Sequence, residues 1–580
     1  MSLKTTLSLV EMMREAPVWI EPETIPGDFD LKSLHQDPLI AELLFRRGIR
    51  DRASAVSYLD PSRKPAPGPG AVPNLGDAVA RVSKAIDNRE RVGIFGDYDV
   101  DGITSTALLT TALRIAIDEK SVLPVLPDRS DGYGLNPTGI DRIVEFGATL
   151  MICVDCGSTD HQNVAYAKAA GLDVVILDHH QMQDTGPSGA ITVNPQLDPD
   201  PTFHGLTGVG LTYLLVCALA AGGYQVVADG QTETDYLDLV ALGTVADVAP
   251  LMGINRTLVR HGLEVLRETR RPGVSALISE SRLSQKGLEA SHIAFQLAPR
   301  INAAGRLASA TTALDLFLSQ NGRTALELAG QLNRHNLDRR GKQELAVQDA
   351  TADILKLPNW KHRGFVSAKS PDWEAGLVGV VAGRLCETLR RPVIVFRQEG
   401  ELLTGSARSV AGFDIAGALR SLTHLLKHHG GHDLAAGLTL AVGNYDEFNQ
   451  EMLKLVADCG IQIPAPKTIQ IDADLDEAHL AQNTVRSIAE LQPFGQGNHQ
   501  PILRIRNVRV LKYTTMSDDK HLKLFVSVGK RNFEAIMWSG DWRSKEFVVA
   551  RYFDLAGKLD LNEFNGQTRL QMVLDDFRES

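Results

Sequence analysis

The stretch Val92-Gly93-Ile94-Phe95-Gly96-Asp97-Tyr98-Asp99-Val100-Asp101-Gly102 places three carboxylates directly after a short apolar run. The apolar run predicts a buried strand. Side chains on extended backbone repeat every two residues, so we expect Asp97, Asp99 and Asp101 to project to one side. Such a cluster repels itself unless protons or cations neutralise it, and its oxygen atoms suit Mg²⁺ or Mn²⁺. A solvated acidic turn is the alternative, because Asp and Gly are also turn residues.

Helical patterns alternate with short apolar runs on both sides of this stretch. We expect helices over residues 75–88, 103–117, 137–146 and 163–170, and strands over 92–96, 122–126, 150–154 and 174–177. Strands that alternate with helices form right-handed crossovers and a parallel sheet. The sequence therefore predicts an α/β fold built on a parallel sheet.

Further acidic and imidazole side chains follow other predicted strands. Asp155 comes after the strand at 150–154, and Asp178-His179-His180 comes after the strand at 174–177. The carboxyl ends of parallel strands share one edge, where open sheets bind ligands. Asp247 interrupts an apolar helical pattern at 235–249; it could cap or end that helix, but in this context we expect a ligand. A metal site at this edge is the hypothesis that these positions favour.

The ligand set indicates which metal and which reaction to expect. Carboxylates with one or two imidazoles favour Mg²⁺ or Mn²⁺, and the imidazoles favour Mn²⁺. Five acids exceed the needs of one ion, so we expect two ions that hydrolyse a phosphate ester. Cys153 and Cys156 form an isolated C-x-x-C pair in an apolar run, which favours structural thiols over a zinc site.

Composition narrows the class of protein. The 580 residues suffice for several domains, and five cysteines provide no disulfide framework. A net charge of −11 argues against a protein that coats nucleic acid, although a local basic channel stays possible. Charged residues interrupt any signal-peptide core, and the uncharged stretch 205–228 is flanked by His204 and Asp229, which favours a buried helix over a membrane span. We expect a cytoplasmic protein.

Four motifs resemble those of the DHH phosphoesterase superfamily and, in detail and order, those of its RecJ family of bacterial 5′-to-3′ single-stranded-DNA exonucleases. The motifs lie at 96–104, 154–157, 178–180 and 243–251. The segments 126–129, 132–135 and 299–307 also resemble this family, and the segments 405–409 and 430–432 resemble its companion DHHA1 domain. The resemblance covers about residues 40 to 575.

The resemblance implies roles for the acidic and imidazole residues. Asp97, Asp99 and Asp155 would serve one metal ion. Asp101, Asp155, His179 and Asp247 would serve the other, with Asp155 as the bridge. His180 would orient the scissile phosphate or protonate the leaving group, and Asp178 would orient a histidine.

The resemblance also implies a substrate-binding set. Arg129, Ser406 and Arg408 would hold a terminal 5′ phosphate, whereas Arg300 and His432 would contact DNA near the cut. The whole set is Arg129, Tyr133, Arg300, Asn302, Arg306, Ser406, Arg408, Gly430, Gly431 and His432. Without the family motif, we would interpret the glycine pair as an ordinary turn and Arg408 as a surface residue. One departure is Glu374, which stands where relatives commonly have a histidine.

We expect five parts along the chain. These are an accessory segment (1–75), the DHH catalytic domain (76–322), a connecting helix (323–357), a smaller α/β DHHA1 domain (358–466) and a C-terminal β-barrel of OB-fold type (467–580). Residues 501–580 hold 14 Lys and Arg against 11 Asp and Glu. This basic balance, together with Tyr513, Phe525, Phe533 and Trp538, suits single-stranded DNA, although most of these aromatics are expected in the core.

The leading hypothesis is a Mn²⁺-dependent or Mg²⁺-dependent exonuclease that degrades single-stranded DNA to 5′-mononucleotides in repair and recombination. The resemblance implies a monomer with a single-stranded-DNA-binding protein and a RecQ-type helicase as partners, and no membrane. Two alternatives stay open. One is a DHH phosphodiesterase for very short oligonucleotides, cyclic dinucleotides or pyrophosphate, and the other is a non-catalytic DNA-binding scaffold.

Overall fold

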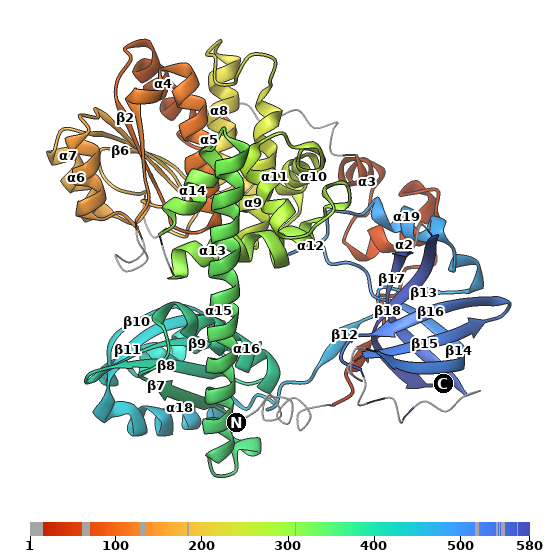
Figure 1. Cartoon of the computed structure of the whole chain (residues 1–580). Coiled ribbons are helices and arrows are strands. Elements are labelled where there is room, and N and C mark those ends of the chain that lie inside the picture. The colour runs from red at the N-terminus through yellow and green to blue at the C-terminus, as the bar shows by residue number, and fades with distance from the viewer. Residues whose placement is uncertain are drawn as a thin grey trace.

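The fold is described from a computed structural model of the chain (Figure 1). The structure describes residues 15–60, 70–127, 134–182, 185–307, 309–516, 521–540, 543, 546, 551–564 and 567–580, without the side chains of 306, 307, 563 and 564. Figure 1 shows two α/β bodies joined by a long helix and a β-barrel beside them. The predicted fold class is therefore confirmed.

A five-stranded parallel sheet lies at the centre of the first α/β body. Its order is β3-β2-β4-β5-β6. The strands are β2 (Val92–Gly96), β3 (Val122–Val125), β4 (Leu150–Val154), β5 (Asp173–Leu177) and β6 (Ala190–Val193). The chain leaves β2 toward β3 on one side and returns to β4 on the other. The two sides of the sheet thus diverge at β2 and β4, and ligands bind at such a point.

Helices cover both faces of this sheet because both faces are apolar. Phe95, Met151 and Ile176 pack on one face against α6 (Pro137–Glu145) and α7 (His161–Ala169). Val92 and Ile94 pack on the other face against α4 (Leu75–Asp87), α5 (Val100–Ala116) and α8 (Gly208–Ala221). Every residue of β2 and β4 is buried, as continuous apolar runs require in a covered parallel sheet.

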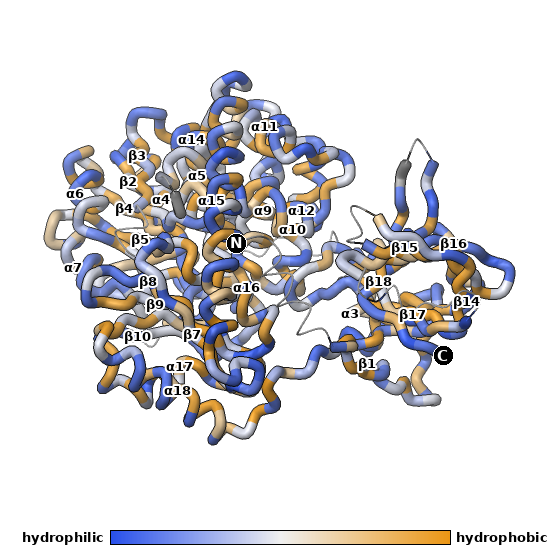
Figure 2. Tube along the Cα trace, turned by 60° about the horizontal axis from the view of Figure 1, so that its bottom comes forward, coloured by the Kyte–Doolittle hydropathy of each residue, from blue (hydrophilic) through white to orange (hydrophobic). Residues whose placement is uncertain are grey.

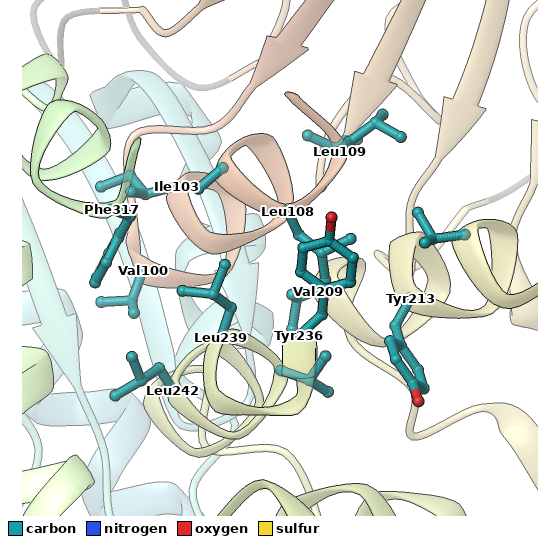
Figure 3. Close-up of a cluster of buried hydrophobic side chains, with 14 of the residues drawn as sticks. Val100, Ile103, Leu108, Leu109, Val209, Tyr213, Tyr236, Leu239, Leu242 and Phe317 are labelled. Carbon is teal, nitrogen blue, oxygen red and sulfur yellow. The ribbon is translucent and has the colours of Figure 1, made fainter. Parts of the chain in front are cut away.

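The uncharged stretch at 205–228 forms the buried helix α8. Figure 3 shows its Val209 and Tyr213 in one buried cluster with Leu108 of α5 and Leu239 of α9 (Leu237–Ala246). Phe317 of α14 (Thr311–Leu318) lies on the opposite side of this cluster, beside Ile103. No helix in the described part of the chain is both long and apolar enough to cross a membrane.

The helix α15 (Gly322–Lys356) joins the two α/β bodies. With 35 residues it spans about 50 Å at 1.5 Å per residue. Ala325, Ala329 and Leu332 belong to the core of the first body, whereas Val347 and Ile354 belong to the core of the second. Each half of the helix is therefore stabilised by a different domain.

The second α/β body holds a mixed sheet of order β10-β11-β9-β8-β7. Its strands are β7 (Val366–Ser370), β8 (Val393–Glu399), β9 (Leu402–Arg408), β10 (Leu426–His432) and β11 (Ala435–Ala441), and its helices are α16 (Ala375–Leu389), α17 (Ile415–Ser421) and α18 (Tyr445–Cys459). The interpretation of the glycine pair Gly430-Gly431, with His432 after it, as a turn is wrong. These residues end the edge strand β10, where they pair with β11.

A closed barrel forms the C-terminal part, from β14 (Leu503–Met516), β15 (His521–Val528), β16 (Arg531–Met537), β17 (Tyr552–Phe564) and β18 (Gln567–Glu579). Pairing of β14 with β17 closes it, and β13 (Ala473–Leu475) extends it. Hydrophobic and hydrophilic residues alternate along its strands (Figure 2). The N-terminal helices α2 (Pro38–Arg46) and α3 (Arg52–Leu59) share the barrel's core, and β1 (Val18–Ile20) pairs with β12 (Thr468–Gln470).

Candidate metal centre

The three acids after β2 do not lie on one extended segment, so that prediction is wrong. The chain turns into α5 at Val100, and Asp99 caps this helix by accepting hydrogen bonds from the N–H groups of Asp101 (2.9 Å) and Gly102 (3.1 Å). Only glycine fits at 102, because a Cβ there would lie 2.5 Å from the carbonyl oxygen of Asp97. Asp101 therefore reaches the site from the first turn of α5, whereas Asp97 and Asp99 precede this helix.

The acidic and imidazole residues nevertheless converge at the carboxyl ends of β2, β4 and β5. Three groups each bring one ligand atom per residue within 4.8 Å of one another. The groups are Asp97, Asp99 and Asp155; Asp101, His179 and Asp247; and Asp155, His179 and His180. Asp155 is shared by two groups, and its backbone is left-handed (φ 60°). These seven residues thus form one cluster whose oxygen and nitrogen atoms can hold divalent cations.

The His179 imidazole lies among three carboxylates of this cluster. Its Nε2 lies 3.1 Å from Oδ1 of Asp155, 3.7 Å from Oδ2 of Asp101 and 3.9 Å from Oδ2 of Asp247. Burial, together with the neighbouring charge of His180, lowers the pKa of His179 to about 4. The imidazole is therefore neutral at pH 7, which is the form that ligates a metal ion.

His180 is held in the opposite protonation state by Asp178. Its Nδ1 lies 2.7 Å from Oδ1 of Asp178 and 4.0 Å from Oδ1 of Asp155. Burial works against the charged imidazole, but the hydrogen bond and charge of Asp178 outweigh it and raise the pKa of His180 to about 9. Asp178 also accepts hydrogen bonds from the N–H groups of Ser158, His179 and His180. Burial opposes ionisation of this carboxyl, yet the bonds and charge of His180 hold its pKa well below the usual range.

The carboxyls of the centre resist ionisation in the absence of a cation. Burial, followed by the charges of Asp247 and Asp99, raises the pKa of Asp101 well above its usual range, and burial and the charge of Asp101 do the same for Asp155. Burial and the charge of Asp99 raise the pKa of Asp247 to about 7. Buried carboxyls that repel one another are relieved when divalent cations replace their protons.

The N-terminus of α8 takes part in the site, and sequence reasoning did not find it. The N–H groups of Gly208 and Val209 donate to Oδ2 and Oδ1 of Asp101 at 2.7 and 2.9 Å. Thr207 caps this helix by accepting a bond from Gly210. A threonine followed by small residues before an apolar run is a visible helix start. Its approach to Asp101, more than a hundred residues away, carries no local signal.

The Ser406, Arg408 and 430–432 positions lie together at one end of the second sheet. Across β9, β11 and β10, Ser406 is in register with Gly437 and Gly430, and Arg408 with Ala435 and His432. These alternate positions share one face of the sheet. Nη1 of Arg408 donates to Oγ of Ser406 and to the carbonyl oxygen of Ala407, each at 2.8 Å. Neither acceptor carries a charge. Burial lowers the pKa of Arg408 from its usual range.

Arg300 and Asn302 lie on α13 (Ala298–Leu307), which contacts the acidic loop. A Cβ at Gly305 of this helix would lie 3.0 Å from the carbonyl oxygen of Tyr98. Arg300 donates to the carbonyl of Gln296 and to Oδ1 of Asn333. The side chain of Arg306, and Arg129 and Tyr133 entirely, lie outside the described residues.

Glu374, the departure from the family pattern, joins two helices. It occupies the N-cap position of α16 without a side-chain capping bond, and its Oε1 lies 2.7 Å from Nζ of Lys342 on α15. The carboxylate therefore forms an ion pair where an imidazole is expected from the resemblance.

Comparisons with known families agree with the two α/β bodies and the barrel. The chain matches the DHH family, N-terminal domain, over residues 91–244, the DHHA1 domain over 362–458 and the RecJ OB domain over 471–576. Fold and site thus define a phosphoesterase of the DHH class.

Similarity along the whole chain narrows this class. The chain is 33% identical to the single-stranded-DNA-specific exonuclease RecJ of Salmonella typhimurium, covering 93% of this chain and 95% of that protein. It is 35% identical to RecJ of Dickeya dadantii, covering 86% and 89%. The crystal structure of RecJ in complex with Mn²⁺ from Thermus thermophilus matches with a TM-score of 0.82 and 28% identity, over 97% of this chain and 80% of that one. The chain belongs to the RecJ family.

Proposed function

We propose that this protein is an exonuclease that degrades single-stranded DNA in the 5′-to-3′ direction to 5′-mononucleotides, in DNA repair and recombination. The observation that carries this proposal is the convergence of Asp97, Asp99, Asp101, Asp155, His179 and Asp247 where β2 and β4 diverge, in a chain similar to RecJ exonucleases over nearly its full length. The relatives named above are single-stranded-DNA-specific exonucleases, and one was crystallised with Mn²⁺.

Two divalent cations, preferably Mn²⁺ or otherwise Mg²⁺, would neutralise the negative charge of the phosphodiester. They would also lower the pKa of a bound water, which would then attack the phosphorus. Asp97, Asp99 and Asp155 would hold one of them, and Asp101, Asp155, His179 and Asp247 the other. Gly208 and Val209 orient Asp101 by binding both of its oxygens, and this fixes the carboxylate before any cation arrives.

His180 is the candidate for the proton at the cut. It is held protonated at pH 7 by Asp178, and its Nδ1 lies 4.0 Å from a carboxylate oxygen of the shared ligand Asp155. A protonated imidazole in this place can donate a hydrogen bond to the scissile phosphate or a proton to the departing oxygen. Asp178 is the residue that orients it.

The face formed by Ser406, Arg408, Gly430 and His432 is the candidate for binding a 5′-terminal phosphate. Arg408 is a partly buried cation whose hydrogen bonds go to neutral oxygens, so a phosphate would supply the negative charge that these partners lack. Small residues at 430, 435 and 437 leave space beside it for the backbone of a chain end. A pocket that only a chain end can fill accounts for exonuclease rather than endonuclease action.

Incubation with Mn²⁺ and a single strand labelled at the 5′ or the 3′ end tests this function directly. We expect labelled mononucleotide at once from the 5′ label and only late from the 3′ label. A blunt duplex and a reaction with EDTA are the controls, and both should stay intact. Degradation that starts from the 3′ label, or no degradation, contradicts the proposal.

The resemblance also underlies the remaining proposals about this protein. We propose that it acts as a monomer in the cytoplasm, together with a single-stranded-DNA-binding protein and a RecQ-type helicase that supplies single strands. Equilibrium sedimentation tests the monomeric state, and co-sedimentation with the purified partners tests the two interactions.

A further inference from the structure

Val248, next to Asp247, has an unusual backbone conformation. The helix α9 ends with Asp247 as its C-cap, and the N–H groups of Val248 and Ala249 then bond to the carbonyls of Val245 (3.2 Å) and Thr244 (3.3 Å). This helix ending requires a left-handed residue, and Val248 adopts φ 59°. Among the residues that the structure describes, it is the one β-branched residue with positive φ. Glycine is the usual residue at this position, because a side chain with a branched Cβ is strained there.

Packing does not explain the valine. Val248 is 65% exposed, whereas Ala249 and Leu251 on the same turn are buried. Other helices of this chain end with glycine in this conformation, such as Gly147 after α6 and Gly171 after α7. A branched Cβ makes this conformation more strained for Val248 than for an unbranched residue such as Arg89, and strain of this kind next to a site motivates a hypothesis of function.

The surroundings of the turn hold Val248 in place from both sides. Beyond it, the N–H of Leu251 donates to the carbonyl of Gln496 at 2.7 Å. Gly495 lies so close to Leu251 that a Cβ there would fall 2.6 Å from its Cδ1. Before it, Asp247 belongs to the metal centre, with Oδ2 3.9 Å from Nε2 of His179. An exposed apolar residue therefore stands on a turn that is anchored at Leu251 and directly follows Asp247 of the candidate metal centre.

We propose that Val248 is a substrate-positioning residue whose methyl groups pack against the deoxyribose next to the cleaved phosphodiester. This inference rests on the proposed function. The phosphate would be held by charge, and charge alone does not fix the rotation of the nucleotide about it. An apolar surface at a fixed distance supplies that constraint, because the carbon side of a deoxyribose can be buried against it. In this proposal, the contact with the deoxyribose offsets the free-energy cost of the left-handed backbone at Val248.

The variant Val248→Gly separates this role from a structural one. Glycine relieves the strained conformation, so the unfolding midpoint should equal or exceed that of the wild type. Loss of the contact should lower kcat/KM on a 5′-phosphorylated single strand about tenfold. The Mn²⁺ affinity, measured by titration calorimetry, should not change. Val248→Thr keeps the shape and the strain but adds a hydroxyl, so it should also lower kcat/KM.

Arg89→Gly is the matched control. Arg89 is left-handed (φ 51°) in a turn with the same two hydrogen bonds, after α4 and at the opposite end of the sheet. This variant should also keep or raise the unfolding midpoint, but with wild-type activity. Wild-type activity in Val248→Gly overturns the inference, and so does a loss of activity accompanied by weaker Mn²⁺ binding, because that would place the effect on Asp247. A wild-type protein that leaves single strands intact would instead refute the proposed function.

Discussion

Burial and neighbouring charged groups set the pKa values of single residues in the metal centre. His179 and His180 are neighbours in the chain, yet the pKa of the first is lowered to about 4 and that of the second is raised to about 9. The difference arises because Asp178 lies 2.7 Å from His180, whereas His179 faces carboxyls that themselves tend to hold protons. Two adjacent imidazoles can therefore divide the work between ligand and proton donor.

Asp155 is the residue whose loss should cost most activity. Asp155→Asn keeps the shape and tolerates the left-handed backbone, but removes the charge shared by the two candidate sites. We expect hydrolysis of single-stranded DNA to fall at least about 10³-fold. Fluorescence anisotropy with a labelled strand should show unchanged DNA binding. Asp173→Asn, an exposed acid at the start of β5, is the control and should keep full activity; equal rates in both variants would refute the role of Asp155.

At the scale of elements, the edge of the parallel sheet converts local structure into a binding site. Each of β2, β4 and β5 delivers an acid at its carboxyl end, and the helix starts of α5 and α8 add backbone donors. The structure confirms the strands predicted from apolar runs. Sequence reasoning missed β9 and β10, because Gly405 and the polar run 427–432 break the alternation that indicates a strand.

Because carboxyls gather at this edge, we expect the stabilisation of the fold by Mn²⁺ to depend on pH. Asp247 has its pKa raised from 3.8 to about 7, so it stabilises the metal-free fold below pH 4, and this contribution is lost as the pH rises through 7. Cations replace the lost proton, so Mn²⁺ should raise the unfolding midpoint more at pH 8 than at pH 6. Scanning calorimetry with Mn²⁺ or EDTA measures both values. In Asp247→Asn, the rise in the unfolding midpoint caused by Mn²⁺ should differ less between pH 6 and pH 8. An equal rise at both pH values in the wild type would contradict this account.

At the scale of the whole molecule, a buried polar junction fastens the barrel region to the catalytic domain. Arg256 of α10 (Gly253–Glu268) donates to the carbonyls of Tyr58 (2.9 Å), Leu491 (2.9 Å) and Glu490 (3.4 Å). Asn498 donates to the carbonyls of Leu491 and Pro493. These bonds connect the N-terminal helices, the catalytic domain and the segment before the barrel. Removal of the barrel with this segment would also disturb the turn at Asp247, so single substitutions on the barrel are the sharper probe.

Trp538 at the end of β16 tests the contribution of the barrel to long substrates. Its side chain is 57% exposed, whereas Phe533 is buried in the barrel core. Stacking of one base on an aromatic ring is worth about 1–3 kcal/mol, so Trp538→Ala should raise KM for a long single strand about tenfold. Hydrolysis of a dinucleotide, which is too short to reach the barrel, should not change. Tyr166→Ala on α7 is the exposed aromatic control, and an equal loss on both substrate lengths would contradict the role of Trp538.

The sequence by itself determined the parallel strands, the acids at their ends, the family motifs and the barrel, because each depends on periodicity or spacing within a few residues. Only the tertiary structure decided that Asp101 lies in the first turn of α5, that the amides of α8 hold it, and that Ser406 lies in register with Gly430. It also decided that Val248 is exposed with a left-handed backbone and that Arg256 joins the catalytic domain to the barrel region. The physical reason is that these features depend on packing and hydrogen bonds between segments far apart in the chain, and no local pattern records such contacts.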